Sequence, residues 1–304
     1  MTTAEPLTLL TGLTGNFDDR TQILVRGEDA ETFLQSIFTA DLNTLESGIL
    51  RASALLSPQG KIQFDFLISR IENGFRIDLA KEGSEVFAKR LTLYRLRAKA
   101  EIIVLNESII RIGWKTDSGR SESDSISLDS YQAVRDERFP DAANVRRYYA
   151  ETDDSSPATQ LERDAWAALR IHYGIAEGGA DFIMNDVFPH DINFEQFSGV
   201  SFKKGCFVGQ EVVSRMQHRG TARRRILQAT AQAALPASDT PITAGGKEVG
   251  TLRSTNGTHG LALVRIDRVK DALDKNIPLL AGETEITLTI PAYAKFTFPE
   301  GTAE

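Results

Sequence analysis

The sequence predicts a mixed α and β protein that ends in a β-rich region. Segments typical of strands alternate with segments typical of helices along roughly the first 225 residues, and short alternating strands follow. The chain has 304 residues, of which 41% are apolar, so it is long enough to bury a sizeable core. Because single cores stop growing near this length, two or three subdomains are expected.

The N-terminal part begins with a strand followed by a helix. Residues 22–25 form a short apolar strand, and a helix is expected to start near Asp29. Four apolar residues share one face of that helix: Phe33, Leu34, Ile37 and Phe38. Turns at 57–60 and 73–74 then predict three antiparallel strands, at 51–56, 61–69 and 75–80.

Another helix and two strands are expected next. Ser84 is a good N-cap for a helix through Leu91 and Tyr94. The apolar, β-branched segments 102–105 and 109–114 return to strand character.

The second half of the chain contains a further helix and the β-rich region. The polar stretch 115–129 is expected to be a surface excursion, and 161–173 has helical spacing up to Gly174, a natural C-terminal cap. A small β-barrel or sandwich is then indicated by four short strands at 226–231, 248–253, 260–266 and 285–290. We therefore expect one domain over 1–222 and a barrel domain over 223–304.

Charge and composition exclude several classes of protein. The net charge of -7 argues against a protein that coats nucleic acid or anionic membrane over its whole surface. The longest apolar runs are far too short to span a bilayer and no targeting segment is evident, so a cytoplasmic protein without a membrane partner is the default expectation. One cysteine excludes a disulfide framework and a metal site built from several cysteines of this chain, so no stable metal is predicted.

The candidate functional centre is that single cysteine, Cys206. Glycines at 205 and 209 let the backbone turn tightly and leave the thiol uncovered, and 209–211 can open a helix. The helix dipole and the charges of Lys203 and Lys204 would favour the thiolate, which predicts a reactive cysteine. The alternative is that Cys206 is a small buried hydrophobe.

The cysteine lies in a strongly basic segment. Residues 203–225 hold seven basic residues and one acid, a net of +6 inside an acidic protein. The segment is either an anion site, with RNA as one candidate ligand, or a solvated cationic face that pairs with the protein's own carboxylates.

The motif around the cysteine resembles a known family signature. The string Lys-Gly-Cys-Phe-x-Gly-Gln-Glu-x-x-x-Arg matches the signature of the YgfZ family, the folate-binding relatives of the glycine-cleavage aminomethyltransferase. Further segments are similar in order, including 33–35 and 94–99, so the resemblance covers roughly residues 7–225. The matching positions of the signature are Lys204, Gly205, Cys206, Gly209, Gln210, Glu211 and Arg215.

The resemblance implies both an architecture and a role. The implied fold is α+β, with intertwined modules around a central folate cavity and a C-terminal β-barrel. The implied role is that of an accessory protein, dependent on tetrahydrofolate or a derivative, that assembles or repairs iron–sulfur clusters in client enzymes, including tRNA-modifying enzymes. Cys206 would be its catalytic residue.

Three residues are candidates for folate contact by the same resemblance. Trp166 matches a tryptophan whose ring could stack on a pterin, although it could equally be a core residue of its helix. Arg20 stands where the family has a second tryptophan, and it could pair with folate's glutamate tail or with Asp18 or Asp19. His172 or Tyr173 stands where the transferase has its pterin-binding carboxylate, although His172 could instead only cap its helix.

Two functions of other classes remain as alternatives. The transferase's catalytic aspartate should follow the strand at 75–80, where this chain has Glu82 and Glu85 but no aspartate, so glycine-cleavage activity is not expected. A one-carbon transferase would require one of these glutamates to point inward. An RNA-binding module would use the basic segment 203–225; nucleic acid is therefore a possible partner, but a less favoured one than folate and iron–sulfur enzymes.

Overall fold

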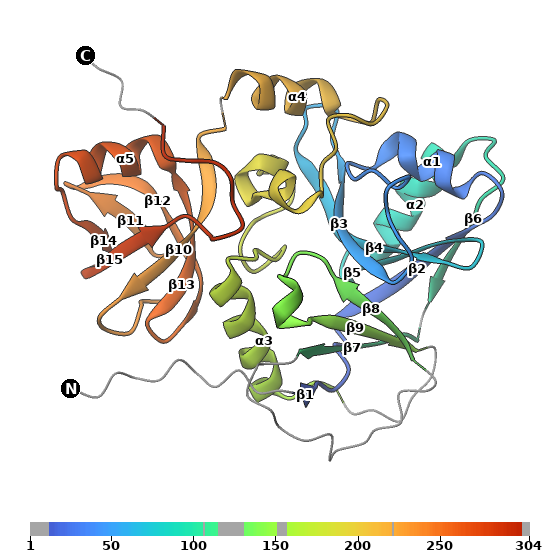
Figure 1. Ribbon diagram of the computed structural model, residues 1–304, viewed down its shortest axis with the longest axis horizontal. Coiled ribbons are helices and arrows are strands. Elements are labelled where there is room, and N and C mark those ends of the chain that lie inside the picture. Colours follow the sequence, from blue (N-terminus) through green and yellow to red (C-terminus); the bar gives the residue numbers. More distant parts are fainter. Residues whose placement is uncertain (1–11, 106, 115–130, 151–156, 221, 300–304) are drawn as a thin grey trace. The chain divides into compact units, whose positions relative to one another are not determined.

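The computed structural model describes residues 12–105, 107–114, 131–150, 157–220 and 222–299 (Figure 1). The chain divides into two compact units. The first consists of Met1–Leu55, Phe64–Ala165 and Phe197–Val208. The second consists of Leu56–Gln63, Trp166–Gln196 and Gly209–Glu304. Each unit is therefore assembled from segments that are far apart in the sequence.

The first unit is built on a nine-stranded sheet with the order β1-β7-β9-β8-β3-β4-β5-β2-β6. The pairs β2–β5, β4–β5, β7–β9 and β8–β9 are antiparallel, and β3 pairs in parallel with β8. The strands are β1 (Gly12–Leu13), β2 (Arg20–Arg26), β3 (Ile49–Leu56), β4 (Ile62–Ile71), β5 (Gly74–Ala80), β6 (Glu101–Leu105), β7 (Ile109–Trp114), β8 (Gln132–Asp136) and β9 (Arg146–Ala150).

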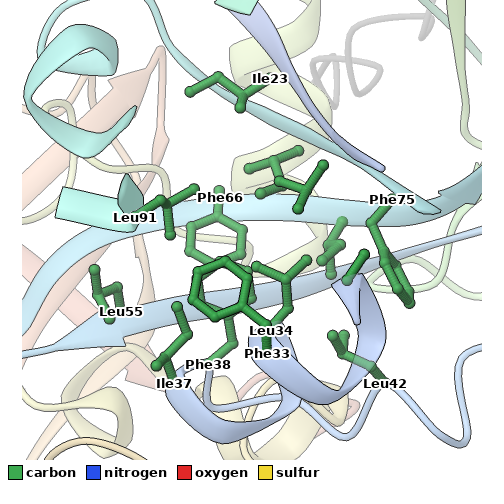
Figure 2. Packing of buried hydrophobic residues seen from close by; sticks show 14 of the residues in the cluster. Ile23, Phe33, Leu34, Ile37, Phe38, Leu42, Leu55, Phe66, Phe75 and Leu91 are labelled. Atoms are coloured by element: carbon green, nitrogen blue, oxygen red, sulfur yellow. The ribbon is translucent and has the colours of Figure 1, made fainter. Parts of the chain in front are cut away.

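Two helices, α1 (Ala30–Ile37) and α2 (Ser84–Arg95), pack against this sheet. Figure 2 shows their side chains meeting those of the strands in one apolar cluster. Three phenylalanines form its centre, with ring centroids 4.5 Å apart for Phe38 and Phe66 and 5.3 Å apart for Phe66 and Phe87. Aromatic pairs at such distances contribute beyond the area that they bury, so α1 is held firmly at its C-terminal end, next to Phe38.

The second unit contains a closed six-stranded barrel with the order β10-β13-β12-β11-β14-β15. Its strands and helix are β10 (Arg224–Ala231), β11 (Pro241–Ala244), β12 (Lys247–Asn256), β13 (His259–Arg265), α5 (Ile266–Asp274), β14 (Leu279–Ala281) and β15 (Thr284–Thr289). Closure removes the free sheet edges, and alternate residues such as Leu227, Leu252 and Ile286 fill the interior.

The described residues form five further helices. They are α3 (Gln160–Tyr173), α4 (Gln210–Arg219) and the 3₁₀ helices η1 (Asp141–Ala143), η2 (Pro189–Ile192) and η3 (Phe194–Phe197). No helix in the described ranges is long and apolar enough to cross a membrane.

Most of the elements expected from the sequence are confirmed, including the three strands after the first helix and the C-terminal barrel. The N-cap of α2 was predicted wrongly: it is Gly83, with φ +82°, and the Ser84 hydroxyl instead donates to the carbonyl of Lys81 at 2.8 Å. Position 266 was expected to end a strand but begins α5. The excursion at 115–129 lies outside the described residues, and the division at 222/223 stays a prediction.

Candidate functional site

The loop that carries Cys206 connects η3 to α4. Cys206 is exposed, as are Lys203 and Gly205, whereas Lys204 and Phe207 are buried. A Cβ added at Gly205 would meet no atom within 4 Å, so the space beside the cysteine is open. The alternative of a small buried hydrophobe is therefore wrong, because the inward-facing neighbours leave the thiol on the surface.

Lys204 anchors this loop to the end of α1. Its ammonium group donates to the carbonyl oxygens of Phe38 at 2.6 Å and Ala40 at 2.8 Å. Burial lowers the pKa of Lys204 to about 8, against the opposing effect of Asp41. The sequence suggested that this charge serves the thiol, whereas the structure shows it bound to backbone oxygens. Its effect on the thiol stays a prediction.

Thr39 provides a second anchor for the same loop. Its hydroxyl donates to the carbonyl of Gly199 at 2.6 Å and accepts the backbone N–H of Ala54 at 2.9 Å. The backbone N–H of Ser201 donates in turn to the carbonyl of Thr39 at 2.9 Å. The two side-chain hydrogen bonds of Thr39 are buried, where a hydrogen bond is stronger than in water, so they fix the base of the cysteine loop.

The second half of the motif belongs to α4 in the second unit. The N-cap of α4 is Gly209, with φ +77°, which confirms the helix start expected at 209–211. A Cβ at this position would lie 2.4 Å from the carbonyl oxygen of Ser57 and 3.1 Å from Cα of Gly60. Only glycine combines this backbone conformation with this approach to the turn.

The remaining motif residues lie on the first turns of α4. Gln210 is partly buried, and Glu211 and Arg215 form an ion pair of 2.5 Å one helical turn apart. Both charged side chains are mostly exposed, at 75% and 66%, so the pair contributes little to stability. It leaves a carboxylate and a guanidinium on the surface of the helix that follows the cysteine loop.

Much of the positive charge of the basic segment is neutralised within the second unit. Arg224 binds Asp186 at 3.1 Å and Asp191 at 2.8 Å. Arg225, which is buried, binds Glu195 at 2.5 Å and donates to the carbonyl of His190 at 2.6 Å. These pairs serve to hold β10 against η2 and η3. They reduce the charge available to an anionic ligand and count against the RNA-binding alternative.

A buried histidine connects η2 with α4. His190 is 0% exposed, and its Nε2 lies 2.9 Å from Oε1 of Gln217. Burial lowers the pKa of His190, although Glu195 and Gln217 act to raise it. A neutral imidazole therefore helps to hold α4, the helix that continues the cysteine motif.

The three candidates for folate contact have different surroundings. Arg20 donates from Nε to Asp78 at 2.6 Å and does not pair with Asp18 or Asp19, which bind Arg163 instead. Trp166 lies on α3 with only 3% of its surface exposed. His172 is exposed near the end of α3, where its ring contacts that of Tyr173 at 4.8 Å.

The partner of Arg20 was not anticipated. Asp78 is 0% exposed and also accepts hydrogen bonds from Arg147 at 3.1 Å and from the hydroxyl of Tyr149 at 2.7 Å. Burial alone would raise the pKa of Asp78, but Arg20, Arg147 and Tyr149 together lower it. The available signal was one acidic residue in the otherwise apolar second half of strand β5. Arg20 is thus bound to a buried carboxylate.

The region that follows β5 does not place a glutamate inward. Glu82 and Glu85 are both exposed. A general base must come within hydrogen-bonding reach of the proton that it removes, and an exposed flexible carboxylate is poorly placed for this task in a cavity. Among the described residues, no group of three or more His, Cys, Asp or Glu side chains is arranged to hold a metal ion.

Comparisons with known proteins place this geometry in a family context. Residues 223–296 match the model of the CAF17 C-terminal β-barrel domain. The mitochondrial iron–sulfur cluster assembly factor IBA57 homologue of Chaetomium globosum is 30% identical over 234 residues, which are 68% of this chain and 54% of the relative. The human mitochondrial IBA57 is 28% identical over 280 residues, which are 84% of this chain and 78% of the relative.

A solved structure extends the likeness to the whole fold. The glycine cleavage system aminomethyltransferase T of Bartonella henselae superposes with a TM-score of 0.68 at 14% identity, and the match covers 95% of this chain and 88% of that one. At this identity the likeness shows the fold alone. It confirms the predicted aminomethyltransferase-like α+β fold with a C-terminal barrel.

Two expectations change with these findings. The named relatives are IBA57 proteins rather than YgfZ, so the resemblance stated from the motif is confirmed only at the coarser level. The expectation of a cytoplasmic protein is wrong, because these relatives are named as mitochondrial. The chain spans only about half the length of the Chaetomium relative. The chain is similar to the IBA57 iron–sulfur cluster assembly factors and has the aminomethyltransferase-like fold.

Proposed function

We propose that this protein assists the assembly of iron–sulfur clusters in client proteins and that Cys206 is the group that contacts the cluster. The observation that carries the proposal is an exposed thiol on a loop whose base is fixed by Lys204 and Thr39. Cysteine thiolates are the usual protein ligands of such clusters. The names of the relatives support the same role.

The single cysteine limits what this chain can do by itself. Clusters of the common types are held by about four thiolates, whereas this sequence contains one cysteine. The cluster is therefore a substrate that this protein helps to transfer, and its other ligands come from a partner or a client protein. Anchored Lys204 and Phe207 keep the intervening thiol at the surface, where a second protein can reach it.

Rescue of cells that lack the protein tests this proposal. Cys206→Ser nearly preserves volume, so a melting temperature close to that of wild type is expected. We expect wild type to restore the activity of a cluster-dependent enzyme such as aconitase, and the Cys206→Ser variant to fail at equal protein level. Ser214→Ala on α4 is a matched control that retains the thiol. Full restoration by the Cys206→Ser variant would contradict the proposal.

We also propose that the fold retains a folate site, with tetrahydrofolate or a derivative as ligand. The aminomethyltransferase fold supports this proposal. The residues fit less well, because the guanidinium of Arg20 is bound to Asp78 and Trp166 is almost fully buried. Isothermal titration calorimetry with tetrahydrofolate, on wild type and on the Trp166→Phe variant, tests whether folate binds. The absence of saturable heat in wild type would contradict folate binding.

A finer proposal is that the clients include tRNA-modifying enzymes. Mass spectrometry of tRNA nucleosides from the same cells tests it, since modifications made by iron–sulfur enzymes should fall when the protein is lost and return with wild type. Unchanged modification alongside restored aconitase would restrict the role to other clients. The transferase and RNA-binding alternatives are less favoured, because Glu82 and Glu85 are exposed and Arg224 and Arg225 are paired.

A further inference from the structure

Helix α2 has an apolar stripe on the side that faces away from the core. Its inward side buries Ser84, Phe87 and Leu91. On the outward side Val86 is 56% exposed and Leu93 is 70% exposed. These two residues are seven apart and so share one face of an α-helix. A surface helix is normally polar opposite its core face, whereas this second apolar stripe stays exposed within the part of the chain that the structure describes.

The stripe ends at a leucine in a rare backbone conformation. Leu96, the C-cap of α2, has φ +48° and ψ -106° and is 85% exposed. Bulky residues seldom adopt positive φ, and such outliers gather at sites of binding or switching. Leu96 follows Leu93 by three residues at the end of the helix, and three of the six large hydrophobic side chains that are exposed in the described ranges belong to this segment.

Part of the positive charge around the stripe has no partner among the described residues, although Lys99 pairs with Glu28 at 2.9 Å. Residues 86–100 contain five basic residues and no acid, in a chain of net charge -7. The side chains of Lys89, Arg90 and Arg97 make no hydrogen bond or ion pair with any described residue. Other arginines of the same unit are paired, as Arg51 is with Glu137 at 2.5 Å. This contrast indicates that the charges around α2 are complementary to something outside the chain.

We propose that the stripe formed by Val86, Leu93 and Leu96 docks an acidic amphipathic helix of a partner protein. Leucines of the partner would pack along α2, helix on helix, while its carboxylates meet Lys89, Arg90 and Arg97. From Val86 to Leu96 the stripe rises about 15 Å, so about three turns of a partner helix cover it. This inference goes beyond the proposed function and does not depend on it.

Two other occupants fit the stripe less well. A membrane surface is normally met by larger apolar faces with aromatic anchors, and the outward stripe is aliphatic only. The overall charge of -7 would also repel anionic lipid. A second copy in a two-fold contact would bring the same basic residues together, which is unfavourable.

Fluorescence anisotropy with defined probes tests the proposal on the full-length protein. The probe is a fluorescein-labelled helical peptide of about 18 residues, near 27 Å long, with leucine on one face and glutamate on the other. The matched peptide has lysine in place of glutamate. We expect wild type to bind the acidic peptide, with an affinity that falls as the salt concentration increases. We expect no binding of the lysine peptide.

Variants then locate the binding site. The pair Leu93→Asp/Leu96→Asp and the charge-only pair Lys89→Glu/Arg97→Glu should each weaken binding about tenfold or more. The control pair Leu161→Asp/Leu273→Asp changes leucines exposed elsewhere and should bind as wild type. Circular dichroism and melting temperatures confirm that each variant is folded.

Four results would overturn the inference. In the first two, wild type binds the acidic and the lysine peptide equally, or one of the α2 pairs binds the acidic peptide as wild type does. In the third, wild type binds phosphatidylglycerol vesicles more strongly than it binds the acidic peptide. In the fourth, wild type sediments as a dimer and the Leu93→Asp/Leu96→Asp pair as a monomer. The vesicle result would assign the stripe to a membrane, and the dimer would assign it to a second copy.

Discussion

Replacing Lys204 by methionine should destabilise the protein while leaving Cys206 in place. The change keeps a long apolar stem and removes the ammonium group that binds the carbonyls of Phe38 and Ala40. Hydrogen bonds to a charged group contribute about 1.5–3 kcal/mol each, so two contribute about 3–6 kcal/mol. The burial that lowers the pKa from 10.5 to about 8 offsets about 3 kcal/mol of this. A net loss of about 1.5 kcal/mol in the free energy of unfolding, the middle of a range of about 0–3 kcal/mol, is therefore expected.

Urea denaturation of Lys204→Met, with Lys203→Met as the matched control, measures this loss. Lys203 is exposed, so its replacement should change stability by less than about 0.5 kcal/mol. The rate at which Cys206 is alkylated separates anchoring from activation. If Cys206 is alkylated more slowly in Lys203→Met, the charge of Lys203 activates the thiol. If the alkylation rate changes in Lys204→Met and the stability also falls, the variant has displaced the loop that carries Cys206.

The dependence on pH gives an independent check. Since the pKa of Lys204 is lower in the folded protein, the unfolded chain binds more protons between pH 8 and 10.5. The contribution of this residue to the free energy of unfolding should therefore rise with pH across that window. The difference between wild type and Lys204→Met shows this rise directly. Equal stability of the two lysine variants, or a difference that does not change with pH, would refute the anchoring role.

Three other changes test the surrounding structure. Asp78→Asn should reduce the free energy of unfolding in urea by about 3–5 kcal/mol, because it removes the buried carboxylate that Arg20 and Arg147 share; a loss below about 1 kcal/mol would contradict this. Gly209→Ala should lower the melting temperature strongly, since φ is +77° and a Cβ would meet the Ser57 carbonyl, whereas Gly205→Ala should behave as wild type. The free energy of unfolding should fall as pH falls below about 6.5, because His190 binds a proton in the unfolded chain more readily than in the folded protein, where burial lowers its pKa. The His190→Gln variant should show a weaker dependence on pH. Parallel pH curves for wild type and the variant would exclude His190 as the cause.

The local parts of the fold could be predicted from the sequence because short-range rules determine them. The turn at 73–74 has Asn73 at φ +59° before Gly74, and the glycine that the motif indicated, Gly209, is the N-cap of helix α4. Alternation of apolar residues was enough to indicate a β-rich C-terminal region. The N-cap of α2 shows the limit of such rules, since two neighbouring residues both suit a cap and the structure uses Gly83.

The sequence by itself determined the candidate cysteine, its motif and the class of fold. Only the tertiary structure decided which charged side chains are bound inside the protein and which lie on its surface. Lys204 lies 166 residues from Phe38, and Arg20 lies 58 residues from Asp78, so neither pairing leaves a periodic signal along the chain. A buried cation must find an acceptor wherever the fold brings one close, because an unpaired charge in the interior is strongly unfavourable. The same basic residue type therefore anchors a loop at Lys204, whereas Lys89 lies on the surface without a partner among the described residues, and burial separates the two.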